Sequence, residues 1–200
     1  MIMKPYEGYK AEASGNSFPM LPVGAYVCEI KNVKIEGHEP DQQLILRLEI
    51  VEGEFTNYYT NRYNADVQRN ASKQLYGTKY KGDFRLNIPN PANTKREHPE
   101  WDVSAFNNMV YCVQTSNPGY EWKWDETSLK GKLVGINVRA GTYNGNPYTT
   151  IGKLETIDDV RKGLCKTMKP KADRLAPSAA EVAAVDPSGF TPIETEDLPF

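Results

Sequence analysis

Two residue types with complementary chemistry alternate through the middle of this chain. Tyrosine rings can stack on nucleobases, and lysines or arginines can neutralise phosphates. Between residues 58 and 85 these are Tyr58, Tyr59, Arg62, Tyr63, Arg69, Lys73, Tyr76, Lys79, Tyr80, Lys81, Phe84 and Arg85. A second group comprises Trp122, Lys123, Trp124, Lys130, Lys132, Arg139, Tyr143 and Tyr148. Stacking contributes roughly 1–3 kcal/mol per base, so two or three exposed rings would suffice for a single-strand site.

Not all of these aromatic residues are expected at the surface. Aromatic side chains in strands usually pack against cross-strand neighbours, and about half of the tyrosines are expected to do so. We assign Trp101 and Phe106 to the core. The rings that we expect to stack bases are Tyr59, Tyr63, Tyr80 and Trp124.

The other reactive residue types are too few and too scattered to predict an active site. The two histidines, His38 and His98, occur beside Glu and Pro in turn-like segments. The three cysteines lie far apart without a Cys-x-x-Cys pair, so neither a disulfide framework nor a zinc site is predicted. Residues 77–82 lack the Gly-Lys-Ser/Thr ending of a phosphate-binding loop. We therefore predict no enzyme, no metal and no cofactor; the enzymatic alternative is a metal-dependent nuclease.

Charge is unevenly distributed along the chain. The net charge is -2, yet residues 176–200 hold five acids and no Lys or Arg, which leaves the remainder mildly basic. Four prolines are spread through this tail, and its low apolar content predicts disorder. The last residues place acids directly before a Pro-stiffened apolar end, as a partner-docking peptide would: Glu196, Asp197, Leu198, Pro199 and Phe200.

Alternating hydrophobicity predicts about five strands. The clearest is Gln43–Val51, which places four aliphatic residues on one face, Leu44, Leu46, Leu48 and Ile50. The other segments predicted to be strands are Gly24–Ile35 with a bulge near Asn32, Phe55–Tyr63, Leu133–Arg139 and Tyr148–Glu155, and Phe84–Ile88 is a candidate for a further short strand. Asn144-Gly145 between the last two is a strong hairpin signal.

The helical signals are fewer. Pro99–Gln114 carries Pro at its start, acids in its first turn, and apolar residues at four-residue steps. Shorter helices are predicted within Asp66–Tyr80 and over Ile157–Met168. This order of elements predicts a mainly β fold, an OB-type five-stranded barrel with one substantial inserted helix; a β-sandwich is the alternative. We expect an N-terminal arm over residues 1–20, the barrel over 21–168, and the tail over 169–200.

Several short stretches resemble phage and prophage single-stranded DNA-binding proteins. They begin with the acidic tip and continue with Leu21-Pro22-Val23-Gly24-Ala25-Tyr26-Val27, Ile50-Val51-Glu52-Gly53-Glu54-Phe55, Ser116-Asn117-Pro118-Gly119-Tyr120-Glu121-Trp122, Leu129-Lys130-Gly131-Lys132-Leu133-Val134-Gly135 and Tyr143-Asn144-Gly145-Asn146. The resemblance implies an OB-fold, sequence-independent binding of single-stranded DNA in phage replication or recombination, and partner proteins docked by the tip. The segment 58–97 is longer than the resemblance explains, and the DNA-contacting aromatics are not carried over from it.

Two functions from different classes remain open at the level of sequence. The first is single-strand binding, and the alternative is a protein–protein adaptor of a replication or recombination complex, whose tyrosine surface would be its interface. The chain shows no charged-then-apolar leader and no apolar run near the ~20 residues that span a bilayer. We therefore expect a cytoplasmic protein without membrane contact, in the host cytoplasm if it is phage-encoded, and a homodimer is compatible with the sequence.

Overall fold

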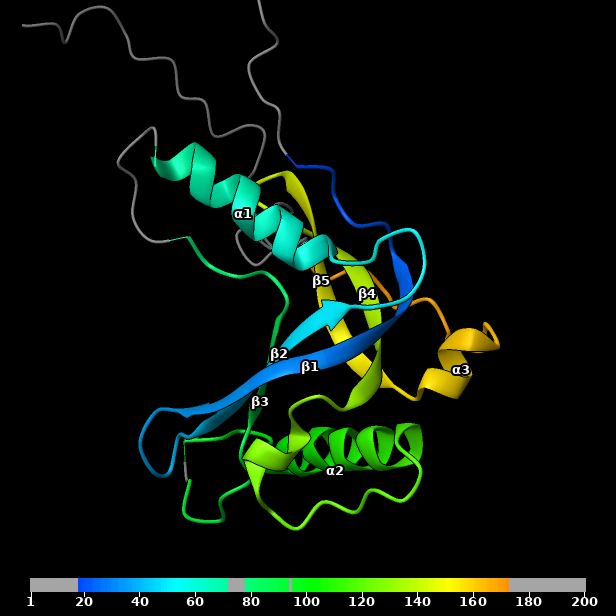
Figure 1. Ribbon diagram of the computed structural model, residues 1–200. Helices are drawn as coiled ribbons and strands as arrows, with labels where there is room; N and C mark the ends of the chain where they lie inside the picture. The colour runs from blue at the N-terminus through cyan, green and yellow to red at the C-terminus, as the bar shows by residue number, and fades with distance from the viewer. Residues whose placement is uncertain (1–17, 72–77, 94, 173–200) are drawn as a thin grey trace, which may run out of the picture.

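Five antiparallel strands form one sheet, with helices inserted between them (Figure 1). The computed structural model describes residues 18–71, 78–93 and 95–172. The strands are β1 (Gly24–Glu36), β2 (Gln43–Ile50), β3 (Asp83–Asn87), β4 (Leu133–Tyr143) and β5 (Asn146–Glu155). The helices are α1 (Tyr58–Ala71), α2 (Pro99–Ser116), the 3-10 turn η1 (Glu126–Leu129) and α3 (Ile157–Arg161). The sheet order is β3-β2-β1-β4-β5, so β3 and β5 are its edges.

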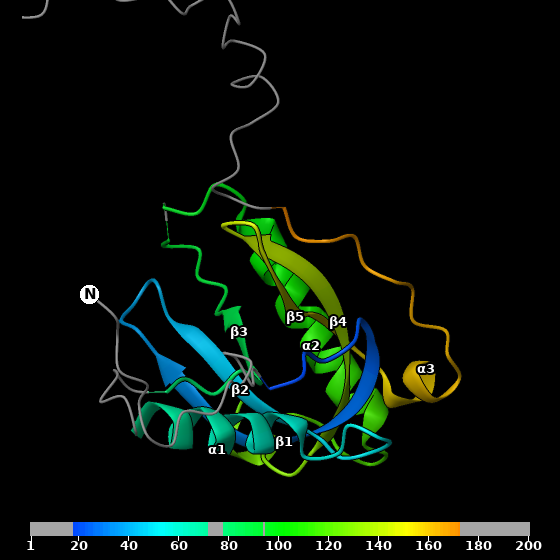
Figure 2. The same cartoon turned by 90° about the horizontal axis from the view of Figure 1, so that it is seen from above.

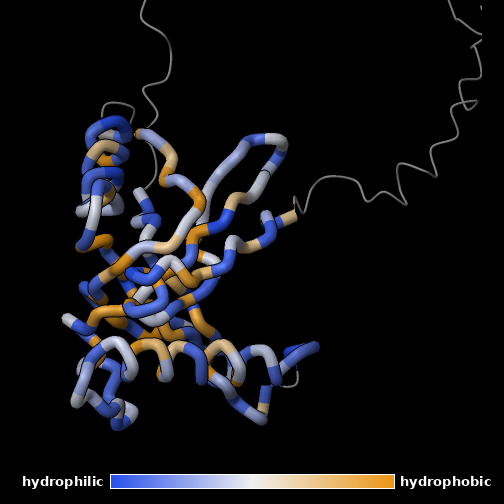
Figure 3. The backbone as a smooth tube through the Cα atoms, turned by 90° about the vertical axis from the view of Figure 1, so that its right-hand side faces the viewer, coloured by the Kyte–Doolittle hydropathy of each residue, from blue (hydrophilic) through white to orange (hydrophobic). Residues whose placement is uncertain are grey.

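The hairpin of β1 and β2 follows the predicted alternation. Leu44, Leu46, Leu48 and Ile50 are all buried on one face. The predicted bulge is confirmed as a register shift between Ile30 and Asn32 where β1 pairs with β2. The β4–β5 hairpin is also confirmed, and it turns at Gly145, whose φ of 75° suits glycine. Apolar residues gather in the sheet, whereas the peripheral loops are hydrophilic (Figure 3).

Helix α2 covers one side of the sheet and completes the core. It contacts β3, β4 and β5, and Figure 2 shows it running beside β4 and β5. Phe106, Met109 and Val113 are buried, which confirms the assignment of Phe106 to the core. The assignment of Trp101 to the core is wrong, because this side chain is 65 % exposed and stacks on His98. Trp101 lies five residues before Phe106, which turns it about 140° around the helix from that buried position.

The predicted strand Phe55–Tyr63 is wrong, because α1 begins at Tyr58. Aromatic residues raise strand propensity, but tertiary contacts override that preference. The carboxylate of Glu49 in β2 accepts hydrogen bonds from the amides of Tyr59 and Thr60 in the first helical turn. An acceptor placed there satisfies N–H groups that have no partner within the helix. Of the helix predicted within Asp66–Tyr80, residues 66–71 belong to α1, and residues 72–77 lie outside the described residues.

The chain after β5 turns back along the sheet. Helix α3 is shorter than predicted and is followed by Gly163 with a φ of 66°. Strand β4 pairs with β1 only as far as Val138, and beyond that point Lys171 forms a parallel bridge with Gly141. The Lys171 amide donates to the carbonyl of Ala140 at 2.8 Å.

Two expectations concern membranes and the ends of the chain. Within the described ranges, the helices are all too short or too polar to cross a bilayer. Of the predicted arm over residues 1–20 and the predicted tail over 169–200, residues 1–17 and 173–200 lie outside the described residues. The described parts are packed or paired, since Phe18 packs against the core and Lys171 bridges to β4.

Candidate nucleic-acid interface

An open groove of about 760 Å³ lies where β1 and β2 meet the segment between α1 and β3. Basic and aromatic side chains dominate its walls, and Asp83 is the acid among them. The described residues that line it are Lys31, Lys34, Arg47, Thr60, Tyr63, Thr78, Lys79, Tyr80, Lys81, Asp83 and Arg85. The combination of cationic groups and rings is suited to a strand with phosphates on one side and bases on the other.

Tyr80 is held in the groove by its hydroxyl group. The hydroxyl lies 2.9 Å from a carboxylate oxygen of Glu49 and 3.1 Å from the carbonyl oxygen of Leu48. Burial raises the pKa of Tyr80, and the neighbouring Glu49 raises it further. The hydroxyl group is therefore protonated at ordinary pH, and its contacts with Glu49 and Leu48 hold the ring in position.

Glu49 connects this ring to α1 and β2. It is 1 % exposed, although it occupies an outward-facing position of β2, because α1 covers it. Its carboxylate accepts hydrogen bonds from the amides of Ile50, Tyr59 and Thr60 as well as from two hydroxyl groups. A buried carboxylate at a helix N-terminus is stabilised both by these donors and by the helix dipole. One side chain thus fixes the helix start and the groove tyrosine together.

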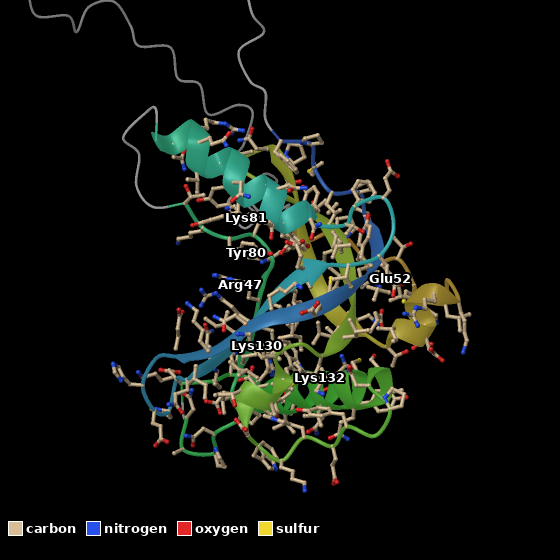
Figure 4. All side chains as sticks on the ribbon, viewed as in Figure 1. Arg47, Glu52, Tyr80, Lys81, Lys130 and Lys132 are labelled. Atoms are coloured by element: carbon tan, nitrogen blue, oxygen red, sulfur yellow. The ribbon has the colours of Figure 1, made fainter. Side chains whose placement is uncertain are left out.

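Arg47 projects from β2 into the same groove. Its Nε and Nη2 donate to the two carboxylate oxygens of Asp83, at 2.9 and 3.2 Å. Its guanidinium carbon lies 4.8 Å from the centroid of the Tyr80 ring. The hydrogen bond to Asp83 raises the pKa of Arg47, so this group stays charged. In the view of Figure 4, Arg47, Tyr80 and Lys81 follow one another on the same side of β1.

The remaining cations of the groove differ in their pairing. Lys34 and Arg85 both bind Glu36, and these two hydrogen bonds lower the pKa of that exposed carboxyl. In the part of the chain that the structure describes, Lys79 and Lys81 are exposed and form no ion pair. The positive charge available for a ligand is therefore greatest at these two lysines.

The structure brings together five of the residues predicted for DNA binding: Tyr63, Lys79, Tyr80, Lys81 and Arg85. Other predicted residues on α1 are placed elsewhere. Tyr58 and Tyr59 are each 5 % exposed, because α1 lays them on the core, and so they offer no face to a base. Arg62 donates to the Tyr58 hydroxyl at 3.3 Å and lies 3.9 Å from Asp66. Lys73 and Tyr76 lie outside the described residues.

The second predicted group does not line this groove. Trp124 is 75 % exposed and Trp122 is half-buried, and both contact Phe106 beside α2. The ammonium group of Lys132 lies 4.3 Å from the centroid of the Tyr120 ring. Arg139 and Tyr148 are half-buried on the β4–β5 hairpin.

Sequence reasoning missed three basic residues of the groove: Lys31, Lys34 and Arg47. All three lie in β1 or β2, at positions where the neighbouring apolar residues suggested core strands. For Arg47 the signal was the alternation itself, because an arginine between the buried Leu46 and Leu48 must face outward from the strand. The β2–β3 register then brings Arg47 opposite Asp83.

Other chemistry has little basis in the described residues. They contain no cluster of His, Cys, Asp and Glu able to hold a metal ion. Burial raises the pKa of the Cys112 thiol to about 12 and that of Cys28 well above its ordinary value. Neither thiol is a nucleophile under those conditions. No family model and no curated protein matches this chain.

Proposed function

We propose that this protein binds single-stranded DNA without sequence preference. The observation that carries the proposal is the groove in which Lys79 and Lys81 lie beside Tyr63 and Tyr80. Phosphate neutralisation by these two lysines, which have no ion pair among the described residues, supplies affinity that depends on salt but not on sequence. Flat side chains accept any base, because every base has a π-face.

The sheet order supports an OB-type barrel as the scaffold. A five-stranded antiparallel sheet in the order β3-β2-β1-β4-β5, with α2 between β3 and β4, would become such a barrel if its two edges approached each other. Oligonucleotides bind OB-folds on the face of the second and third strands. Arg47 and Arg85 extend from β2 and β3 here, which fits that mode of binding.

The wider role is a further part of the proposal. The resemblance to phage and prophage single-stranded DNA-binding proteins supports action in DNA replication or recombination. Residues 196–200, which lie outside the described residues, would recruit partner proteins through Phe200 and the two preceding acids.

The test is binding of fluorescently labelled oligo-dT, followed by anisotropy at increasing salt. Binding that weakens linearly on a log–log plot is expected, and each lysine that contacts a phosphate contributes about 0.7 to the slope for a single strand. The double variant K79A/K81A should reduce the slope by about 1.4. Its matched control is K95A/K162A, which removes the same charge from lysines outside the groove. Absence of binding at low salt would refute the proposal.

A protein–protein adaptor is the second candidate. Exposed aromatic side chains outside the groove favour it, since Trp101, Tyr111 and Trp124 are 65 %, 63 % and 75 % exposed. Aromatic residues of this kind are enriched in protein interfaces. An adaptor would bind its protein partner without affinity for oligonucleotides, so the same anisotropy experiment separates the two functions.

A further inference from the structure

Arg47 is held in the groove by two different contacts. Its guanidinium carbon lies 4.8 Å from the centroid of the Tyr80 ring, and two of its nitrogens donate to Asp83. Asp83 lies directly opposite Arg47 in the β2–β3 register and is only 15 % exposed at its side chain. The guanidinium plane therefore cannot turn without breaking a bidentate ion pair.

The ring beneath Arg47 is enclosed on several sides. Tyr59 and Tyr63 lie near the Tyr80 ring, with centroid distances of 6.1 and 6.0 Å. The hydroxyl of Tyr80 is bound to the buried Glu49. Arg47 covers one face of the ring, so a base cannot reach that face while the ion pair with Asp83 persists.

Arg47 also differs from the groove lysines in its charge. Asp83 compensates Arg47 at hydrogen-bond distance, whereas Lys79 and Lys81 have no carboxylate partner among the described residues. A compensated cation contributes little to phosphate neutralisation. A planar guanidinium nevertheless stacks on bases as an aromatic ring does, and the Arg47 side chain keeps 39 % of its surface exposed to the groove.

We infer that Arg47 is the platform on which a base stacks, with Tyr80 supporting the guanidinium from beneath and Asp83 fixing its plane. The inference rests on the proposed function, and it assigns to Arg47 the stacking contact with the flat face of a base. In this arrangement Lys79 and Lys81 bind phosphates, and Arg47 binds a base.

The experiment compares oligo-dT with an abasic oligonucleotide of equal length, by anisotropy over a range of salt concentrations. R47K keeps the charge and removes the plane. We expect it to bind oligo-dT about tenfold more weakly, the lower part of the range for one stacked base. Its affinity for the abasic strand and its salt slope should equal those of the wild type. R161K is the matched control, because Arg161 also binds a carboxylate through two nitrogens, at Glu52 on another part of the surface (Figure 4).

A second variant tests the same point without altering net charge. R47Q/D83N removes both members of the ion pair, and it should lose the same tenfold on oligo-dT while retaining its affinity for the abasic strand. If R47K fails to fold, R47Q/D83N alone is compared with the wild type on the two strands. The inference is overturned if both variants bind oligo-dT as the wild type does, or if the loss is equal on the two strands. Failure of the wild type to bind either strand would refute the proposed function instead.

Discussion

Replacing Glu49 by glutamine should destabilise this protein far more than the near-equal size of the two side chains suggests. In the native state Oε1 accepts from the amides of Ile50 and Tyr59. Oε2 accepts from the amide and hydroxyl of Thr60 and lies 2.9 Å from the Tyr80 hydroxyl. A glutamine retains one oxygen, and its NH₂ group must face the donors that the other oxygen served.

The magnitude follows from which donors can adapt. The two hydroxyl groups can rotate to accept from the new NH₂ group, but a backbone N–H cannot. Either orientation of the amide therefore leaves at least one backbone N–H without its acceptor, either the buried amides of Ile50 and Tyr59 or the partly buried amide of Thr60, which costs about 1–3 kcal/mol. The remaining bonds lose the assistance of the negative charge and become roughly half as strong. We expect the free energy of unfolding to fall by about 3 kcal/mol in total, a large share of the 5–15 kcal/mol typical of a domain.

Urea unfolding followed by circular dichroism measures this change. The midpoint should fall for E49Q with an unchanged m-value, because the same surface is exposed on unfolding. E52Q provides the matched control, since Glu52 is an exposed carboxylate paired with Arg161 and should change stability by less than about 1 kcal/mol. If E49Q and E52Q were equally stable, the hydrogen bonds to Glu49 would not hold α1 and Tyr80 in place.

Three further predictions concern other parts of the fold. Arg161 lowers the pKa of Glu52 in the folded protein. This pair should therefore stabilise the folded state above the ordinary glutamate pKa of about 4.3 and lose its effect as the pH falls through the lower pKa of the folded state. In urea titrations the free energy of unfolding of E52Q should accordingly vary less with pH between about 5 and 3 than that of the wild type. A Cβ on Gly82 would lie 2.5 Å from the backbone oxygen of Leu48, whereas one on Gly152 would meet the flexible side chain of Met168. G82A should therefore lower the free energy of unfolding by about 1–3 kcal/mol and G152A by less. Equal urea midpoints for the two variants would contradict this reasoning. In the folded protein a thiol reagent should label Cys165 first, because it is half-buried while the other two thiols are buried, and mass spectrometry of digested protein identifies the labelled site.

Local patterns predicted the strands and the main helix. The alternation in β1 and β2 and the Pro-initiated α2 are encoded within a few neighbouring residues, and their bounds agree with the structure to within two residues. The start of α1 could not be predicted in this way, because the acceptor for the amide of Tyr59 in its first turn is Glu49, which lies ten residues earlier in β2. Trp101 shows a related error. The apolar period of α2 was extended to this residue, but the buried side of the helix begins only one turn later, at Phe106.

The candidate site divides in the same manner. Lys79, Tyr80 and Lys81 were predicted because they are consecutive and mix both chemistries. Arg47 was missed because its role depends on Asp83, a partner 36 residues away that only the strand register brings into contact. Tyr58 and Tyr59 have the right chemistry for stacking, but the helix turns them inward. Residue type alone therefore identified the segment that lines the groove, but only part of the groove surface.

The parallel bridge between Lys171 and Gly141 bears on self-association. Beyond Val138 one side of β4 has lost its neighbour β1, and unpaired backbone groups on such a margin can recruit a strand from another molecule. The returning chain hydrogen-bonds to Ala140 there and presents a lysine, a residue type that discourages strand addition. A second copy joining through its sheet would therefore find this margin of β4 already taken.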